Sequence, residues 1–267
     1  MSQEALAQAP LIELTGIYKA FGRQRIYDDL ALRVQRGETL ALLGGSGSGK
    51  SVLLKMLIGL VKPDSGSVRF DGKELAALDE DALLPIRRRI SMLFQSGALF
   101  DSISVGENIA YPMREHLTLS EKEIAARVAE KLQLVGLPGI QEMRPAELSG
   151  GMRKRVAIAR AIAADPEVLL YDEPTTGLDP INARRINELI LAIQRDLHVT
   201  SLVVTHDLAS AFMVSDRMAM LSDRRIIATL PSEEFRRSEE PAIRDFVTAM
   251  AQGRLPHGQG HQEGMRA

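Results

Sequence analysis

Residues 44–51 read Gly-Gly-Ser-Gly-Ser-Gly-Lys-Ser and match the phosphate-loop pattern G-x-x-x-x-G-K-[ST] in full. The stretch lies between a continuous apolar segment, residues 39–43, and a helix whose leucines fall on one stripe. A buried strand before the loop and a helix after it are the context that this pattern requires. The sequence therefore predicts a triphosphate-binding loop within an α/β fold.

The residue types in this loop suit phosphate chemistry. Glycines let backbone N–H groups converge on phosphate oxygens, and the N-terminus of the next helix adds partial positive charge. Lys50 is expected to contact the β- and γ-phosphates, and the Ser51 hydroxyl to ligate Mg²⁺. The residues predicted to bind the nucleotide are Gly44, Gly45, Ser46, Gly47, Ser48, Gly49, Lys50, Ser51 and Val52.

A second apolar strand, residues 168–172, ends in the first of two carboxylates. Because alternate residues on a strand point to opposite faces, Asp172 and Glu173 are expected to have different roles. Asp172 is the candidate to join Ser51 around Mg²⁺, and Glu173 is the candidate base for an attacking water. The sequence thus predicts in-line attack of water on the γ-phosphate of ATP, with Lys50 and Mg²⁺ taking up charge.

A further helix opens at residue 149 with glycines in its first turn. Serine is a good N-cap, but two glycines in the first turn weaken the helix. Glycines at this position are expected where bare N–H groups must approach a ligand closely, and an anion is the natural ligand. Since the chain already has a phosphate loop with its own lysine, this helix end is expected to serve a nucleotide held by another copy. The three basic residues at 153–155 are expected to form a solvated helix face. The residues predicted to contact the other copy's nucleotide are Ser149, Gly150, Gly151 and Met152.

Composition sets wider limits on function. Of 267 residues, 45% are hydrophobic, and 33 Lys+Arg against 35 Asp+Glu give a formal net charge of −2. A chain so close to neutral lacks the long-range field that free nucleic-acid binding usually needs. The absence of cysteine excludes disulfides, thiolate zinc sites and cysteine nucleophiles. No apolar run approaches the roughly 18 residues of a membrane span, so the sequence predicts an intracellular, water-soluble chain.

Alternation of strands and helices predicts a largely parallel sheet covered by helices. Expected strands are residues 11–17, 27–34, 39–43, 67–70, 90–94, 168–172 and 201–205. The predicted divisions are an N-terminal tail (1–10), an ATPase domain (11–230) with a helical subdomain at about 96–165, a helical extension (231–251) and a disordered tail (252–267). Apolar residues at helical spacing in the extension favour packing over a dimer latch.

Six short elements resemble those of an ABC transporter's nucleotide-binding subunit over residues 11–230. They are residues 44–51, Gln95, 148–151, 168–173, 177–179 and 205–207, in that order. The resemblance implies a P-loop NTPase core of the ABC ATPase type, with a helical subdomain and an antiparallel β subdomain. It also implies a head-to-tail homodimer with two ATP molecules between phosphate loop and partner signature helix.

The same resemblance implies roles for several single residues. Gln95 contacts Mg²⁺ or the attacking water, Asp179 lies at the dimer seam, and His206 contacts the γ-phosphate. Phe21 falls where the family stacks an aromatic ring on adenine, with Tyr18 as the alternative. Met152 stands where the family usually has glutamine, which leaves the strength of the contact across the dimer open.

The stretch at residues 91–116 favours a narrower group. Leu99 and Phe100 are expected to lie exposed in the groove that grips the permease, the alternative being packing inside the helical subdomain. This stretch resembles the Mla/Mce-type phospholipid-transport ATPases of bacterial envelopes. The implied partners are an integral membrane permease, an MCE-domain lipid-binding protein and a small STAS-domain subunit, with no nucleic acid. The implied location is peripheral, on the cytoplasmic face of the inner membrane.

Other functions fit the core motifs less well. An ATPase of an importer for amino acids, metals or another small solute remains open, because that specificity lies in the membrane subunit. A soluble ABC ATPase acting on ribosomes or DNA normally has two such halves or a long coiled-coil insertion, and neither is present. A regulatory subunit that does not hydrolyse ATP is disfavoured by the intact Glu173 and His206.

Overall fold

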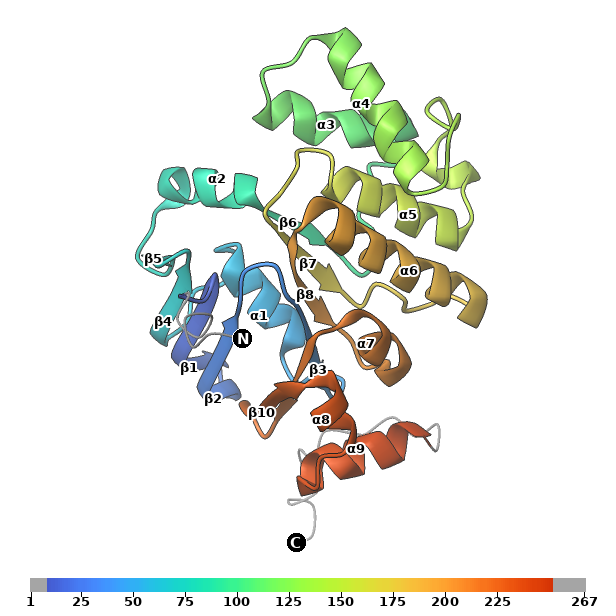
Figure 1. Cartoon of the computed structure of the whole chain (residues 1–267). Coiled ribbons are helices and arrows are strands. Elements are labelled where there is room, and N and C mark those ends of the chain that lie inside the picture. The colour runs from blue at the N-terminus through green and yellow to red at the C-terminus, as the bar shows by residue number, and fades with distance from the viewer. Residues whose placement is uncertain (1–8, 252–267) are drawn as a thin grey trace, which may run out of the picture.

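A six-stranded sheet forms the centre of the computed structural model, which describes residues 9–251 (Figure 1). The strand order is β10-β9-β3-β8-β7-β6, parallel throughout except for β10, which pairs antiparallel at one edge. Parallel strands bring their carboxyl ends to one edge, and the candidate site residues follow those ends. The strands are β3 (Thr39–Gly44), β6 (Ile90–Leu93), β7 (Val168–Asp172), β8 (Thr200–Val204), β9 (Arg217–Ser222) and β10 (Arg225–Pro231).

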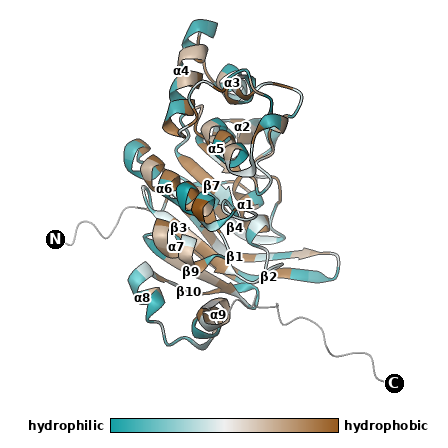
Figure 2. Ribbon diagram, turned by 90° about the vertical axis from the view of Figure 1, so that its right-hand side faces the viewer, coloured by the Kyte–Doolittle hydropathy of each residue, from teal (hydrophilic) through white to brown (hydrophobic). Residues whose placement is uncertain are grey.

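Both faces of this sheet are covered, which explains the continuous apolar runs in its strands. In β3, Leu40 and Leu42 pack into a core shared with α1 (Lys50–Leu57), whereas Ala41 and Leu43 pack into a separate cluster on the other face. In Figure 2 the hydrophobic strand β7 lies inside, between more hydrophilic helix surfaces. The sheet therefore holds the site on a rigid, buried frame.

A second, antiparallel sheet covers the α1 side, as the resemblance implied. Its strand order is β2-β1-β4-β5. The first strand runs on past the predicted end at residue 17 to Phe21, through several irregularities in its pairing with β2. This extension carries Phe21 toward the phosphate loop. The strands are β1 (Ile12–Phe21), β2 (Gln24–Val34), β4 (Ser65–Phe70) and β5 (Lys73–Glu74).

Helices form a layer against the β6 side of the central sheet (Figure 1). Four of them begin at a side chain that accepts a backbone N–H of the first turn, namely Ser104, Ser120, Ser149 and Asp179. Within residues 9–251, no helix combines the length and apolar character that crossing a bilayer requires. The layer consists of α3 (Val105–His116), α4 (Glu121–Leu134), the 3₁₀ turn η2 (Pro145–Glu147), α5 (Gly150–Ala161) and α6 (Pro180–Leu197), whereas α2 (Glu80–Arg89) packs into the core shared with α1.

The last part of the described chain packs on the β9 and β10 side of the sheet. After α7 (Leu208–Val214), the β9–β10 hairpin leads to α8 (Ser232–Arg236) and α9 (Pro241–Ala251). Phe235, Ile243 and Phe246 are buried against strand residues of the same chain. The side chains of the expected extension thus pack within one chain. The predicted disordered tail, and residues 1–8 of the predicted N-terminal tail, lie outside the described residues.

Candidate active site

The phosphate loop joins β3 to α1 and is held from behind by β2. Gly49 adopts a left-handed conformation, φ +105°, and a Cβ atom there would lie 2.7 Å from Cγ2 of Ile26. The Tyr27 hydroxyl donates to the Gly49 carbonyl at 2.6 Å. Only glycine fits this position, and Tyr27 is an anchor for the loop that sequence reasoning missed.

Lys50 is the first residue of α1, and its side chain folds back over the loop. Its ammonium donates to the Gly44 carbonyl at 2.9 Å and to the Gly45 carbonyl at 3.1 Å. Burial lowers the pKa of Lys50, and the nearby carboxylates of Glu173 and Asp172 oppose that shift. The Ser48 hydroxyl is buried without a hydrogen-bond partner among the described residues. A convergent ammonium and an unpaired hydroxyl fit phosphate oxygens.

Ser51 and Asp172 lie together, as the sequence predicted. The Ser51 hydroxyl donates to Oδ1 of Asp172 at 2.9 Å, and burial raises the pKa of that carboxyl group. Within residues 9–251, no cluster of three His, Asp or Glu side chains is placed to enclose a metal. One hydroxyl and one carboxylate are the protein ligands typical of Mg²⁺ that is bound mainly through nucleotide phosphates. This pair of oxygens therefore fits Mg²⁺.

Glu173 follows the end of β7 and has partners different from those of Asp172. Its φ of +50° is rare for a residue with a side chain. One carboxylate oxygen lies 2.8 Å from Nδ1 of His206 and accepts from the Thr176 hydroxyl at 3.1 Å, while the other lies 3.9 Å from Nζ of Lys50. The expected separation of roles rested on strand alternation, which was the wrong reason. The chain leaves the strand at Glu173 and turns this side chain toward His206.

A hollow of about 410 Å³ brings the predicted residues together. Phe21 reaches it from the antiparallel sheet and is half exposed, with Nζ of Lys19 5.2 Å from its ring centroid. Tyr18 does not line the hollow, which favours Phe21 as the base-stacking residue. The lining residues are Phe21, Ile26, Gly45, Ser46, Gly47, Gly49, Lys50, Ser51, Val52, Gln95, Glu173 and His206.

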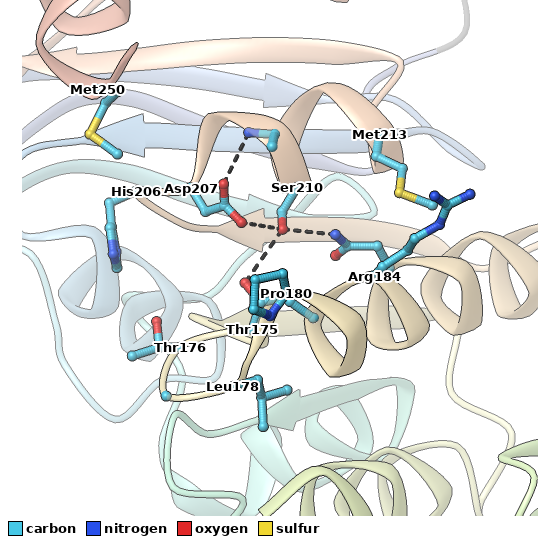
Figure 3. A pocket seen from close by; sticks show the side chains of 14 residues that line it. Thr175, Thr176, Leu178, Pro180, Arg184, His206, Asp207, Ser210, Met213 and Met250 are labelled. Atoms are coloured by element: carbon cyan, nitrogen blue, oxygen red, sulfur yellow. Dashed lines mark hydrogen bonds between the residues drawn. The ribbon is translucent and has the colours of Figure 1, made fainter. Parts of the chain in front are cut away.

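A larger hollow of about 730 Å³ shares His206 with the first (Figure 3). Ser210 ties its wall together, since its hydroxyl donates to Asp207 and accepts from Nδ2 of Asn187 at 2.8 Å. These bonds join the start of α7 to α6 directly behind the loop that carries His206. The larger hollow holds no Lys50 or Ser51, so the phosphate chemistry belongs to the smaller one.

The start of α5 does not line the hollow of its own phosphate loop. Ser149 caps the helix by accepting the Met152 N–H at 3.3 Å, and Met152 packs partly against the helical core. A Cβ at Gly151 would lie 3.1 Å from Cγ and Oδ1 of Asn182, whereas one at Gly150 would meet only Leu178, at 3.9 Å. Gly151 is therefore explained by helix packing, and Gly150 alone keeps an open approach.

Comparison with known proteins decides the family. The family model described as "ABC transporter" matches residues 27–176, more than half of the chain. The chain belongs to the ABC transporter family. It is an ATP-hydrolysing transporter subunit, an ABC cassette.

Several relatives are similar over most of this cassette. It is 44% identical over 236 residues to the probable ribonucleotide transport ATP-binding protein mkl of Mycobacterium leprae, covering 88% of this chain and 68% of that one. It is 39% identical over 248 residues to the intermembrane phospholipid transport system ATP-binding protein MlaF of Escherichia coli, covering 93% and 92%. The dimeric cassette MJ0796 in a post-hydrolysis state with ADP and Pi is 31% identical, with a TM-score of 0.76, over 83% of this chain and 98% of that one.

The predicted seam residue Asp179 is placed by its local structure. Asp179 caps α6 by accepting from the backbone N–H groups of Ile181 and Asn182, both at 3.0 Å. These hydrogen bonds, with the one from the Asn182 side chain, lower the pKa of Asp179. Its carboxylate is therefore ionised and fixed at the surface at the start of α6, which leaves it accessible to another chain.

The predicted permease groove is only partly as expected. Phe100 is 46% exposed, and its ring lies 5.3 Å from that of Tyr111, itself 48% exposed. Leu99 is half-buried against the helical core, so the expectation that both residues lie exposed was wrong for Leu99. Tyr111 of α3 lies on the surface beside Phe100 in its place.

The prediction of a solvated face at residues 153–155 holds for Arg153 and is wrong for Lys154, which is only 7% exposed. Arg155 is half-buried, with its guanidinium donating to the carbonyls of Val135 and Gly136. Helical periodicity was the sequence signal that could have predicted the burial of Lys154. Lys154 lies three residues after the buried Gly151 and three before the buried Ala157, on the covered stripe of α5.

Proposed function

We propose that this cassette powers intermembrane phospholipid transport in a bacterial envelope. The observation that supports this most is the end-to-end match to MlaF, which spans 93% of this chain and 92% of that protein. The mkl proteins match at slightly higher identity, but about a third of their length lies outside the match. Their printed name concerns ribonucleotides, so ribonucleotide transport is the competing assignment.

The proposed reaction is hydrolysis of ATP to ADP and phosphate. Glu173 accepts a proton from the water that attacks the γ-phosphorus, while the bond from that phosphorus to the β,γ-bridging oxygen breaks. His206 orients the Glu173 carboxylate, from which its Nδ1 lies 2.8 Å, and is proposed to contact the γ-phosphate. Lys50 stabilises the charge that develops on the phosphate oxygens.

Mg²⁺ is proposed to be held by Ser51, Asp172 and Gln95, where it would neutralise charge on the β- and γ-phosphates. Ser51 and Asp172 are in hydrogen-bond contact, and Gln95 lines the same hollow. Phe21 is proposed to stack on the adenine, because its exposed ring borders the phosphate loop.

Two copies are proposed to close head to tail around two ATP molecules. The start of α5 lies away from the hollow of its own chain, and Gly150 leaves that helix end open. A helix N-terminus with unpaired N–H groups attracts anions, so the partner's γ-phosphate is a suitable ligand. Asp179 is proposed to lie at the seam. The proposed location is the cytoplasmic face of the inner membrane, where Phe100 and Tyr111 would contact the permease.

The test of transport class is gentle extraction from membranes, followed by mass spectrometry of co-purifying proteins and bound lipids. An MCE-domain protein and phospholipid in the complex, with or without a STAS-domain subunit, is the expected result. A solute-binding protein in their place would overturn the proposal in favour of a small-solute importer.

The test of the reaction is Glu173→Gln in the complex with the permease. Turnover is expected to fall at least about 100-fold while ATP binding persists, because only the general base is removed. Normal turnover would remove Glu173 from the mechanism.

A further inference from the structure

The buried Lys154 bonds the backbone carbonyls of two predicted site residues, Gln95 and Glu173. The Lys154 ammonium, carried by α5, donates to the backbone carbonyl of Gln95 and, at 3.4 Å, to that of Glu173. The residue is 7% exposed. Burial lowers the pKa of Lys154, and the charges of Asp172 and Glu173 oppose that shift.

These two carbonyls belong to segments that follow neighbouring parallel strands. Gln95 comes two residues after the end of β6, and Glu173 directly follows the end of β7. Neither segment continues as regular structure at that point, so strand pairing does not fix their separation. Lys154 supplies a bond between them that originates in a third element, the helix whose first turn holds Ser149 and Gly150.

The Glu173 carbonyl is a sensitive place for such a bond. The residue has a φ of +50°, a conformation that is unfavourable for side chains other than glycine. Its N–H is held by the Val204 carbonyl of β8 at 2.9 Å. The hydrogen bond from Lys154, which belongs to the helical layer, holds the carbonyl of Glu173. With both its N–H and its carbonyl held, the backbone of Glu173 is fixed, and this helps to orient the carboxylate.

We propose that Lys154 is a positioning residue for hydrolysis. It sets Gln95 and Glu173 relative to each other and ties both to the helix that meets the partner's nucleotide. The inference rests on the roles proposed above for Gln95 and Glu173. A lysine of merely structural importance would affect folding stability without a selective effect on turnover.

The test compares Lys154→Met with a matched control, Arg155→Met, in the full chain with its permease. Arg155 is the next residue of the same helix, and it also donates to two backbone carbonyls, but these are those of Val135 and Gly136, which do not line the hollow, whereas Lys154 bonds Gln95 and Glu173, which do. Measured quantities are Tm, affinity for a non-hydrolysable fluorescent ATP analogue, and kcat. Lys154→Met is expected to lower kcat about 10- to 100-fold, since small misplacement of catalytic groups has effects of that size.

Nucleotide affinity is expected to stay within about threefold in both variants, and kcat of Arg155→Met within about twofold. Lys154→Arg is expected to recover most of the lost kcat, because a guanidinium also donates to carbonyls. In a Gln95→Ala background, the effect of Lys154→Met is expected to shrink, as it does for residues acting through one another.

Equal losses of kcat in Lys154→Met and the Arg155→Met control would overturn the inference, as would full additivity with Gln95→Ala. Should Lys154→Met not fold, Lys154→Arg and Lys154→Gln are measured instead, and unchanged kcat in Lys154→Gln overturns the inference. Glu173→Gln is run in parallel. If it retains turnover, the proposed function fails, whereas turnover retained by the Lys154 variants alone refutes only the positioning role.

Discussion

The two glycines at the start of α5 are expected to respond differently to alanine. A Cβ at Gly150 meets only Leu178, at 3.9 Å, on its own chain. A Cβ at Gly151 lies 3.1 Å from two atoms of Asn182, whose amide is bonded to Asp179 at 2.5 Å and so does not swing away freely. Gly150→Ala therefore changes only the surface that the start of α5 presents to another molecule, whereas Gly151→Ala also disturbs the packing between α5 and α6.

The magnitudes follow from these distances. Alanine in place of a helical glycine stabilises by up to about 1 kcal/mol. At Gly150 nothing opposes that gain. At Gly151 overpacking costs about 1–3 kcal/mol, which leaves a net loss of up to about 2 kcal/mol. For a chain of this size, the two variants should then differ in Tm by roughly 5 °C.

Activity is expected not to follow stability. Gly150→Ala should keep or raise Tm yet lower kcat at least about tenfold, because its methyl group keeps the partner's γ-phosphate from the helix N-terminus. Gly151→Ala should lower both quantities. Tm is measured by thermal unfolding of the purified chain, and kcat with the permease present. A Gly150→Ala variant with normal kcat would refute the anion-binding role of this helix end.

Mixing two inactive variants tests whether that role is played across the dimer. In a mixed dimer of Lys50→Ala and Gly150→Ala chains, head-to-tail pairing places both defects in one pocket and leaves the other pocket intact. Half of the dimers are mixed and each has one good pocket of two, so activity should recover to at most about a quarter of wild type. Pockets built within single chains would show no recovery.

Three further predictions concern single residues. Lys50→Ala should weaken ATP binding at least about tenfold in a fluorescence titration, because it removes a charge-assisted contact; unchanged affinity contradicts the phosphate-loop assignment. Phe246→Ala should cost about 3–5 kcal/mol in denaturant unfolding, since the ring is 3% exposed in the α9 cluster, whereas Tyr111→Ala, 48% exposed, should cost little. Burial raises the pKa of Asp172 above its ordinary 3.8, so the native state binds that proton more tightly than the unfolded chain, and stability falls as pH rises through the raised pKa. Asp172→Asn should therefore raise the Tm of the nucleotide-free protein at pH 7, and this gain should shrink as the pH approaches 3.8; a gain independent of pH would show that the carboxylate charge is not its cause.

The sequence predicted the central strands well because their signal is simple. The run at residues 39–43 is apolar on both faces since both are covered, as the split of Leu40 and Ala41 between two clusters shows. The β9–β10 hairpin was missed because its turn lacks the usual sequence signal. Its turn places Asp223 and Arg224 at φ +47° and +67°, where glycine and asparagine are the usual signals.

Most of the candidate site was predictable because the phosphate loop and the acidic strand end are contiguous motifs. What the sequence did not reveal are contacts between distant segments. Tyr27 bonds the Gly49 carbonyl from another sheet, and Lys154 bonds the Gln95 carbonyl from another layer. A lysine between two arginines is expected on the surface. That Lys154 is buried follows only from the way α5 packs against the sheet.

The contacts of Glu173 join the central sheet to the helical layer. Its N–H bonds the Val204 carbonyl, and its carboxylate lies against His206, which follows β8, so these contacts stay with the central sheet. The Lys154 bond to its carbonyl comes from α5, which packs with α3 and α4. A rotation of that helical layer would therefore pull on the backbone of Glu173 while leaving the His206 contact in place. Because the rings of Phe100 and Tyr111 lie together on this layer, the permease contact proposed there would be coupled to the base through Lys154.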